Sequence, residues 1–247
     1  MLRSFVVCWA LMAVPAMLSA QHEGTEHDGS PRPTSLTAGP HRHGAASDGW
    51  EGSSAGIAYS ERNHHIAGLF VLLMGLAELG HALRLTSFRW TTFLLPLALT
   101  GTGLFLTIWS DHEAWPVGSL GFAQTFFGQD HEIVQHKIYG LLALAVGTIE
   151  LIRRLGLMGH AAWTTPLPVM AILGGLMLFG HSHGDHPSAH KIALHHALMG
   201  TMALTAGSSK LLAGWFLGWS PLLSSKWEFL WAGLILLIGA QLLIYSE

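Results

Sequence analysis

The chain has 247 residues, of which half are hydrophobic and only 11% are charged. A soluble domain carries about 25% charged residues because its surface faces water, so the low charged fraction indicates contact with a lipid bilayer. The formal net charge of −3 argues against nucleic acid as a partner. The chain also contains 17 histidines and 10 tryptophans. Tryptophan is typical of the two interfaces between a membrane and water.

The first twenty residues have the pattern of a cleavable signal peptide. Arg3 provides a basic start, residues 5–14 form an apolar run, and Leu18-Ser19-Ala20 is a small-residue cleavage site. The apolar run is too short to span a bilayer comfortably. Cys8, the only cysteine, lies within this segment. We therefore expect a mature protein without disulfides, cysteine-bound zinc or iron–sulfur clusters.

Residues 21–60 are rich in Gly, Ser, Thr, Pro and His and contain few apolar residues. Such a composition cannot bury enough apolar surface to fold alone, so we expect a disordered, extracytoplasmic arm. Its histidines and carboxylates have two interpretations. The arm is either a solvated tail or a low-affinity collector of divalent first-row metal ions.

Residues 61–247 contain six apolar segments, each close to the roughly 20 residues that a helix needs to cross the hydrocarbon core. They lie at about 65–83, 91–109, 134–152, 163–181, 191–213 and 227–245. These segments predict an all-α integral membrane protein, a six-helix bundle over residues 61–247.

The basic residues between the apolar segments lie in alternate loops. They are Arg84 and Arg89, Arg153 and Arg154, and Lys210 and Lys226. The segments 110–131 and 182–190 contain no Lys or Arg. By the positive-inside rule the basic loops are cytoplasmic. A cleaved signal peptide predicts the same topology, a multi-pass protein of the bacterial inner membrane whose mature N-terminus is extracytoplasmic.

One four-residue pattern recurs along the chain. His64, Gly68, Gly75 and Glu78 are repeated 72 residues later as His136, Gly140, Gly147 and Glu150, and a further 60 residues on as His196, Gly200, Gly207 and Lys210. At 100° per residue the four positions form one stripe on a helix. Small residues on such a stripe allow close helix packing in lipid. The pattern predicts three repeated helical hairpins, the third more diverged than the others.

Fifteen of the seventeen histidines lie on the predicted extracytoplasmic side. If the three hairpins surround one axis, His64, His136 and His196, or its neighbour His195, converge at the outer mouth. Histidines with a carboxylate or water commonly hold Cu, Zn, Ni or Fe. The candidate metal ligands are His64, His136, His181, His183, His195, His196 and Asp111. The alternative is that these histidines bond to water and backbone at the headgroup level.

The identity of the metal is suggested by methionines within the helices. Met199 and Met202 lie about one turn below His195 and His196. Thioether sulfur favours Cu(I), so copper is the preferred ion, although methionine in a membrane helix usually serves packing. Zinc, nickel and haem remain open.

The matched charges at the inner ends of the helices, Glu78, Glu150 and Lys210, have two interpretations. They either lock the three hairpins together or mark an exit for protons or ions.

Four short motifs carry a resemblance to a known family. They are Glu61-Arg62-Asn63-His64, the segment from Ser110 to Pro116, Gln135-His136-Lys137 and His181-Ser182-His183. Over residues 60–200 the chain resembles bacterial copper-resistance membrane proteins of the CopD-like type. The resemblance implies copper handling at the periplasmic face, with import into the cytoplasm, at His64, Asp111, His136, His181 and His183. Larger members of that group have more spans than the six expected here.

Motifs of hydrolases, phosphate-binding loops and dinucleotide sites are missing from the sequence, so we expect no enzyme activity. The predicted function is binding of copper, or another late first-row metal, in copper resistance or homeostasis. The first alternative is a b-type haem electron-transfer protein, because histidines on neighbouring helices can ligate haem. The second is a non-catalytic factor that delivers metal to a periplasmic metal-binding protein.

Overall fold

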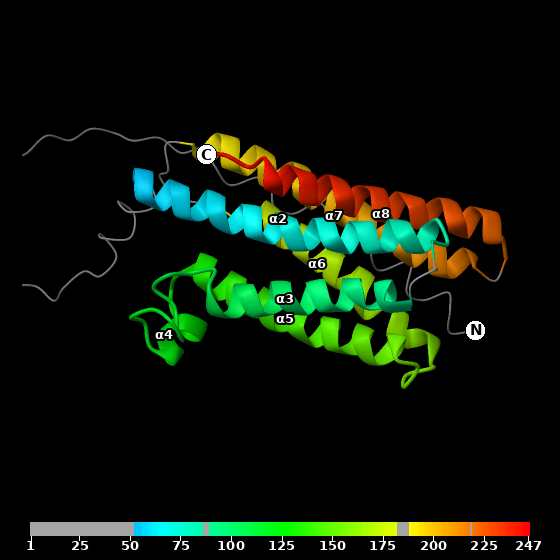
Figure 1. Cartoon of the computed structure of the whole chain (residues 1–247). Helices are drawn as coiled ribbons and strands as arrows, with labels where there is room; N and C mark the ends of the chain where they lie inside the picture. The colour runs from blue at the N-terminus through cyan, green and yellow to red at the C-terminus, as the bar shows by residue number, and fades with distance from the viewer. Residues whose placement is uncertain (1–51, 86–88, 182–187, 218) are drawn as a thin grey trace, which may run out of the picture. The chain divides into compact units, whose positions relative to one another are not determined.

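The computed structural model describes residues 52–85, 89–181, 188–217 and 219–247 (Figure 1). These residues belong to one compact unit, which covers Arg42–Glu247. The predicted signal peptide, most of the predicted arm and the candidate ligand His183 lie outside the described residues.

The described residues form helices, as the composition predicted. The α-helices are α2 (Ser54–Ala82), α3 (Leu94–Ile108), α4 (Phe122–Phe127), α5 (His131–Arg154), α6 (Pro166–Phe179), α7 (Ala189–Phe216) and α8 (Pro221–Leu243). Short 3₁₀ turns, η2 (Arg89–Phe93) and η3 (Ala161–Thr164), precede α3 and α6. The predicted all-α class is therefore confirmed. Helix α4 was not predicted from the sequence.

The first seven residues of helix α2, 54–60, lie within the predicted arm. The Ser53 side chain caps the helix by accepting a hydrogen bond of 3.1 Å from the Gly56 amide. The next two turns are held by contacts with distant segments. Tyr59 donates to the Trp109 carbonyl at 2.8 Å, and the Ser60 hydroxyl donates to Glu247. Tertiary contacts therefore order a polar segment that composition alone predicted to be disordered.

The residues at the two ends of helix α5 explain why this helix forms here. The Asp130 side chain accepts hydrogen bonds from the amides of Glu132 and Ile133, at 3.1 and 3.2 Å. Glu132 lies in the first turn, and Arg153 and Arg154 lie in the last. This arrangement complements the helix dipole at both ends. It also fixes the position of Glu132 near the outer end of the bundle.

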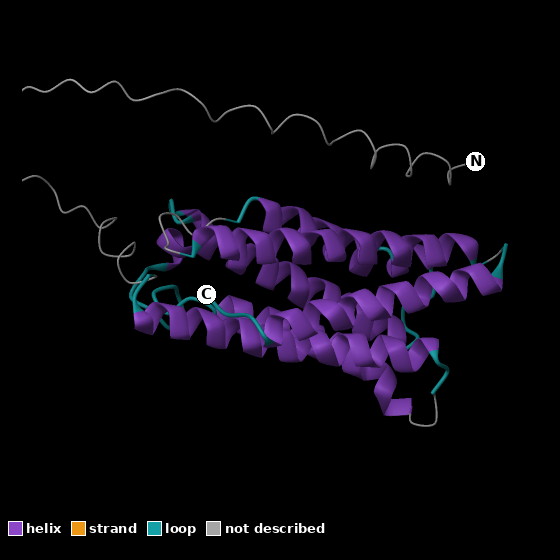
Figure 2. Ribbon diagram, turned by 90° about the horizontal axis from the view of Figure 1, so that it is seen from above, coloured by secondary structure: helices purple, strands orange, loops and turns teal. Residues whose placement is uncertain are grey.

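The six long helices pack as a bundle, and their closest partners are not always neighbours in sequence (Figures 1 and 2). The most extensive contacts join α2 with α8, α3 with α5, and α6 with α7. Apolar side chains from these helices form the core, including Leu95, Leu99, Val146 and Leu167. The chain therefore closes on itself through the contact between its first and last long helices.

The glycines of the repeated stripe lie at these helix contacts. A Cβ atom on Gly75 would lie 2.8 Å from the Leu236 amide nitrogen of α8. A Cβ on Gly147 would lie 2.6 Å from Thr100 Oγ1 of α3, and one on Gly207 would lie 2.5 Å from the Pro168 carbonyl of α6. Real Cβ atoms do not approach other atoms so closely. The stripe is therefore a packing surface, as predicted.

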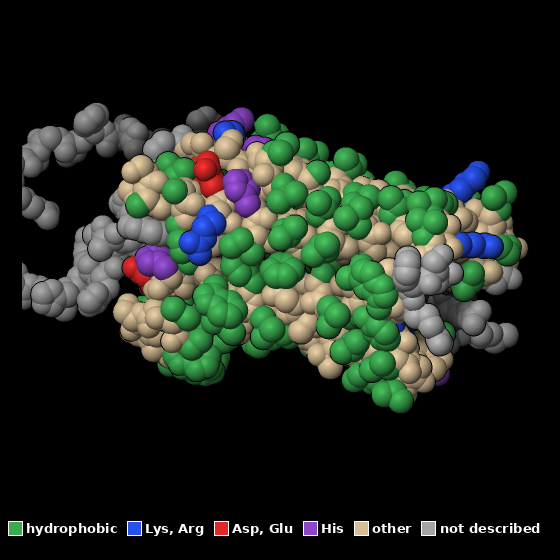
Figure 3. All heavy atoms as spheres, in the orientation of Figure 1, with side chains coloured by type: hydrophobic (Ala, Val, Ile, Leu, Met, Phe, Trp, Pro, Cys, Tyr) green, Lys and Arg blue, Asp and Glu red, His purple; other side chains and the backbone are tan. Residues whose placement is uncertain are grey.

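Four helical segments are long and apolar enough to cross a membrane. They are Ser54–Ala82, Trp90–Ile108, Ala161–Phe179 and Pro221–Leu243. Four of the six predicted spans are thus matched by apolar helices of sufficient length. Helices α5 and α7 have 24 and 28 residues, also enough in length, but they are not among these four apolar segments. Figure 3 shows hydrophobic side chains covering the visible face, with histidines and acidic residues gathered toward one end.

Candidate metal centre

Asp111 is the centre of a polar cluster where the chain leaves helix α3. Its Oδ1 atom lies 2.8 Å from His136 Nδ1, and its Oδ2 atom lies 2.9 Å from Lys137 Nζ. The Ser110 hydroxyl donates to Oδ2 at 2.5 Å. The Lys137 side chain is fully buried and also donates to the Leu106 carbonyl at 3.2 Å. Asp111 thereby joins the end of α3 to the first turns of α5.

The electrostatic surroundings keep Asp111 ionised. Burial alone would raise the pKa of its carboxyl group, because a low-dielectric environment disfavours charge. The charge and hydrogen bond of His136, the charge of Lys137 and the Ser110 hydroxyl act in the opposite direction. Together they lower the pKa of Asp111 to about 2. Asp111 is therefore a carboxylate at any pH at which imidazole can bind a metal.

Four histidines from four helical segments meet at this end of the bundle. The ring centroids of His136 and His181 are 5.6 Å apart, and those of His181 and His196 are 4.9 Å apart. The His64 ring stacks at 6.2 Å from His196. These contacts link α2, α5 and α7 through the end of α6. His64, His136 and His196 do converge, and His181 lies among them.

Two of these histidines combine with an acidic residue to form a candidate metal site. Glu132, His136 and His181 each offer one ligand atom, and the three atoms lie within 4.8 Å of one another. The side chains of Glu132 and His181 are 26% and 9% exposed, so the group is partly shielded from water. Two imidazoles and one carboxylate leave room for a further ligand on an ion held there.

Hydrogen bonds fix which ring nitrogen of each histidine can ligate. His136 Nδ1 lies 2.8 Å from Asp111 Oδ1, and His181 Nδ1 lies 2.9 Å from Gln135 Oε1. Both partners are acceptors, so both Nδ1 atoms carry the proton. Nε2 is then the ligating atom of each ring. A histidine ligand commonly donates its other N–H to a carboxylate or carbonyl in this way, which orients the ring and increases its basicity.

His195 does not join the other histidines. Its Nδ1 atom accepts a hydrogen bond of 3.3 Å from the Gln241 amide, and its ring lies 5.4 Å from that of Tyr245. Adjacent residues of a helix point about 100° apart, so His195 and His196 cannot both face the axis. The structure resolves the choice between them in favour of His196.

His64 is held by the C-terminal segment, which the sequence reading did not connect with the site. Its ring stacks on Tyr245 with centroids 3.9 Å apart, and its Nδ1 donates to the Ser60 carbonyl at 2.9 Å. Tyr245 is buried, and burial together with the charge of Glu247 raises the pKa of its hydroxyl group. Tyr245 is thus an uncharged, buried side chain that packs against the His64 ring.

A cavity of about 150 Å³ leads to the histidines and is strongly acidic. Its carboxylates are Asp111, Glu113, Asp130, Glu132 and Glu247. No Lys or Arg is among its described lining residues. His64 and His136 form part of its wall and also line a second, deeper cavity. We call the acidic cavity the vestibule.

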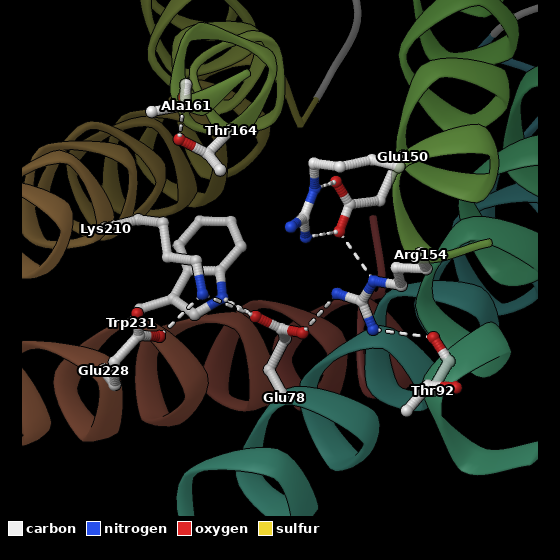
Figure 4. Close-up of polar contacts among 10 residues, drawn as sticks. Glu78, Thr92, Glu150, Arg154, Ala161, Thr164, Lys210, Glu228 and Trp231 are labelled. Carbon is white, nitrogen blue, oxygen red and sulfur yellow. Dashed lines mark hydrogen bonds and ion pairs between the residues drawn. The ribbon is translucent and has the colours of Figure 1, made fainter. Parts of the chain in front are cut away.

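The opposite end of the bundle holds a second polar cluster, centred on Glu78 (Figure 4). Glu78 accepts hydrogen bonds from Lys210 Nζ at 2.9 Å, Arg154 Nη2 at 2.8 Å and Trp231 Nε1 at 2.8 Å. Arg154 Nε also donates to Glu150 at 2.6 Å. The matched residues Glu78, Glu150 and Lys210 therefore meet, with Arg154 as the link between the two glutamates.

Two groups outside the repeated pattern complete this cluster around Glu78, which we call the inner cluster. Lys210 donates to Glu228 Oε2 at 2.6 Å, and Arg154 Nη1 donates to the Thr92 carbonyl at 2.7 Å. Each buried charge thus has at least one partner of opposite charge, which buried ions require. The cluster connects α2, α5, α7 and α8.

Glu132 is the functional candidate that the sequence reading missed. It precedes His136 by four residues, and residues four apart lie on the same face of a helix. That spacing is a signal that could have identified it. Gln135 and Lys137 gave no comparable signal, because their roles depend on His181 and Asp111 from other segments.

These features define a helical membrane protein with several candidate spans and a histidine–carboxylate group at one end. Comparison of the chain with protein-family models, curated proteins and solved structures finds no match.

Proposed function

We propose that this protein binds a late first-row metal ion, with copper preferred, through Glu132, His136 and His181 on the extracytoplasmic side of the bacterial inner membrane. The observation that carries the proposal is the convergence of three ligand atoms within 4.8 Å. Asp111 is assigned an orienting role, because its two oxygens already hold His136 and Lys137. The biological role is metal resistance or homeostasis.

The vestibule supports the proposal through its charge. Carboxylates that line a cavity of low dielectric concentrate the negative potential and attract cations. A cation that entered the vestibule would reach Glu132 and His136, which both line it. The wall of the vestibule therefore contains two of the three proposed ligands.

Copper is preferred because soft ligands lie beyond the triad. The deeper cavity is lined by His64, His196 and the thioethers of Met177 and Met199. Imidazole accepts both copper oxidation states, and thioether sulfur favours Cu(I). The resemblance to CopD-like proteins points in the same direction, including their role in moving copper across the membrane.

The architecture proposed for this function is a six-span bundle of three hairpins about one axis. In support, each principal helix contact joins the second helix of one hairpin to the first of the next, α3 to α5, α6 to α7 and α8 to α2. Gly147, Gly207 and Gly75 occupy equivalent places at these three contacts. The basic residues Arg153 and Arg154 then lie at the cytoplasmic end, opposite the histidines.

A metal titration of the purified full chain in detergent tests the proposal. His136→Ala should weaken copper binding at least tenfold, about 1.4 kcal/mol, and Glu132→Gln should weaken it measurably. His195→Ala is the matched control, because His195 faces Gln241 and should leave affinity unchanged. Binding should fall between about pH 7 and pH 5 as protons compete for imidazole.

Three results would refute the proposal. Equal losses for His195→Ala and His136→Ala would place the ion elsewhere. Affinity that disappears on deletion of residues 21–51, with no effect of His136→Ala, would place it in the arm. An intense Soret band in the visible spectrum of the purified protein would identify haem instead.

A further inference from the structure

A second cavity, of about 270 Å³, lies inside the helix bundle beneath the histidines. It extends from His64, His136, His181 and His196 at one end to Trp231 at the other. Trp231 is itself buried and donates its indole N–H to Glu78, so the inner charged cluster lies beyond that end. We call this space the axial cavity. Its volume approaches that of pockets that hold small organic molecules.

The lining of the axial cavity selects against charged molecules. No Asp, Glu, Lys or Arg is among its described lining residues. Most of its wall is aliphatic, with Leu95, Leu167, Ala171 and Ile235 as examples. A charged organic molecule in such a space would lose its hydration without gaining a counter-ion, whereas a soft metal ion could still be coordinated by imidazole and thioether. Polar side chains gather at the histidine end, so a molecule that fits has one polar end and an apolar body.

The histidines specify the chemistry of that polar end. Nδ1 of His136 donates to the Asp111 carboxylate, and Nδ1 of His64 donates to the Ser60 carbonyl. Each ring has one proton in its neutral form, so Nε2 of both rings is a hydrogen-bond acceptor. The group that matches these two acceptors on a ligand is therefore a donor, such as a hydroxyl.

The walls also specify the shape of the apolar body. Four methionines, Met74, Met170, Met177 and Met199, line the axial cavity together with Tyr139 and Trp231. Thioether sulfur makes favourable contacts with aromatic rings, and methionine adapts to irregular shapes. Aromatic rings also pair favourably with other aromatic rings. A flat ring therefore suits this lining better than a branched aliphatic body.

We propose that the axial cavity binds an uncharged, lipophilic phenol of the hydroquinone class, with its hydroxyl toward His64 and His136. This ligand site is distinct from the metal triad, because Glu132 does not line the axial cavity. The two sites share His136 and His181, which belong to the triad and also line the cavity.

Calorimetric titration of the full chain in detergent with trimethylhydroquinone, without oxygen and with a metal chelator, tests this site. Ala203→Phe fills the cavity from α7 and should weaken binding at least tenfold. Ala193→Phe is the matched control on the same helix, because Ala193 is exposed. The dimethyl ether of the hydroquinone lacks the donor and should bind at least tenfold more weakly than the parent compound.

Glu132→Gln separates this proposal from the proposed metal site. It should weaken metal binding and leave hydroquinone affinity unchanged. Ala203→Phe should weaken hydroquinone binding and leave metal affinity unchanged. Ala203→Leu repeats the test with a smaller side chain if the phenylalanine variant does not fold. Wild-type affinity in a folded Ala203→Phe or Ala203→Leu protein overturns the proposal. Equal binding of the ether, or an equal loss in Ala193→Phe, also overturns it.

Discussion

Asp111 uses both of its carboxylate oxygens to hold other side chains in place. One oxygen meets His136 at 2.8 Å, and the other meets Lys137 at 2.9 Å. A carboxylate in this position orients an imidazole ligand and increases its basicity. Asp111 was expected from the sequence to be a ligand itself. Because both oxygens already hold other side chains, the role proposed for Asp111 is to orient His136.

Asp111→Asn should lower metal affinity by about tenfold to 100-fold, the range typical for loss of such a partner. The amide keeps the size of the side chain but removes the negative charge that holds Lys137 and that makes His136 more basic, and it leaves one acceptor oxygen in place of two. Glu113→Gln is the matched control, because Glu113 lies in the same vestibule and is 47% exposed. Metal titrations at pH 7 provide the measurement, and equal affinities for the two variants would contradict an orienting role.

The pH dependence of metal binding separates Asp111 from the histidines. The pKa of the Asp111 carboxyl group is lowered to about 2. The contribution of the charged carboxylate to folding stability is therefore fully present above the usual pKa of 3.8, and it is lost only as the pH falls through about 2. Between pH 7 and pH 5 its charge does not change. A loss of affinity over that interval therefore does not come from Asp111, and protonation of imidazole is its expected cause.

The candidate residues differ in how far the sequence predicted them. His64, His136 and His196 were predicted to converge, because a repeated pattern places them at equal depth on three helices. Glu132 and Gln135 were missed, because one turn of α5 carries them beside His181, which follows the other helix of the hairpin, α6. Such partners depend on how closely two helices approach, which spacing along one helix does not specify.

At the scale of helices, the glycine stripe determines how closely neighbours pack. Gly75→Leu should destabilise the bundle by about 1–3 kcal/mol or more, because the new side chain would collide with the α8 backbone at Leu236. Gly80→Leu is a matched control in the same helix, since nothing lies within 4 Å of a Cβ atom at Gly80. Thermal unfolding in detergent compares the two variants. Equal melting temperatures would mean that the contact with α8 is not closely packed.

Helix positions were predicted well where apolar residues run continuously and less well elsewhere. The span expected at 227–245 corresponds to α8, and the span at 91–109 corresponds to η2 and α3. The first turns of α2 were missed because Ser53, Tyr59 and Ser60 are ordered by capping and by contacts with residues far along the chain. Local composition does not contain these contacts.

At the scale of the whole bundle, orientation in the membrane is the property most open to test. Reporter fusions after residue 156 should be cytoplasmic, and fusions after residue 120 should be extracytoplasmic, because Arg153 and Arg154 lie next to the first site and no Lys or Arg lies in 110–131. A fusion within the arm, at residue 45, provides a further extracytoplasmic reference. A cytoplasmic signal after residue 120 would place the histidines on the wrong side for the proposed function.

The buried pair of Lys137 and Asp111 has a consequence for the valence of a bound ion. Lys137 compensates the charge of Asp111, so Glu132 is the one ligand of the triad that contributes uncompensated negative charge. A singly charged cation on two neutral imidazoles and Glu132 would give a complex of zero net charge, whereas a doubly charged cation would leave one positive charge. In a partly dehydrated site next to the hydrocarbon core, a complex without net charge has the lower free energy. In the proposed metal centre, the pairing of Lys137 with Asp111 would therefore favour singly charged ions over doubly charged ions.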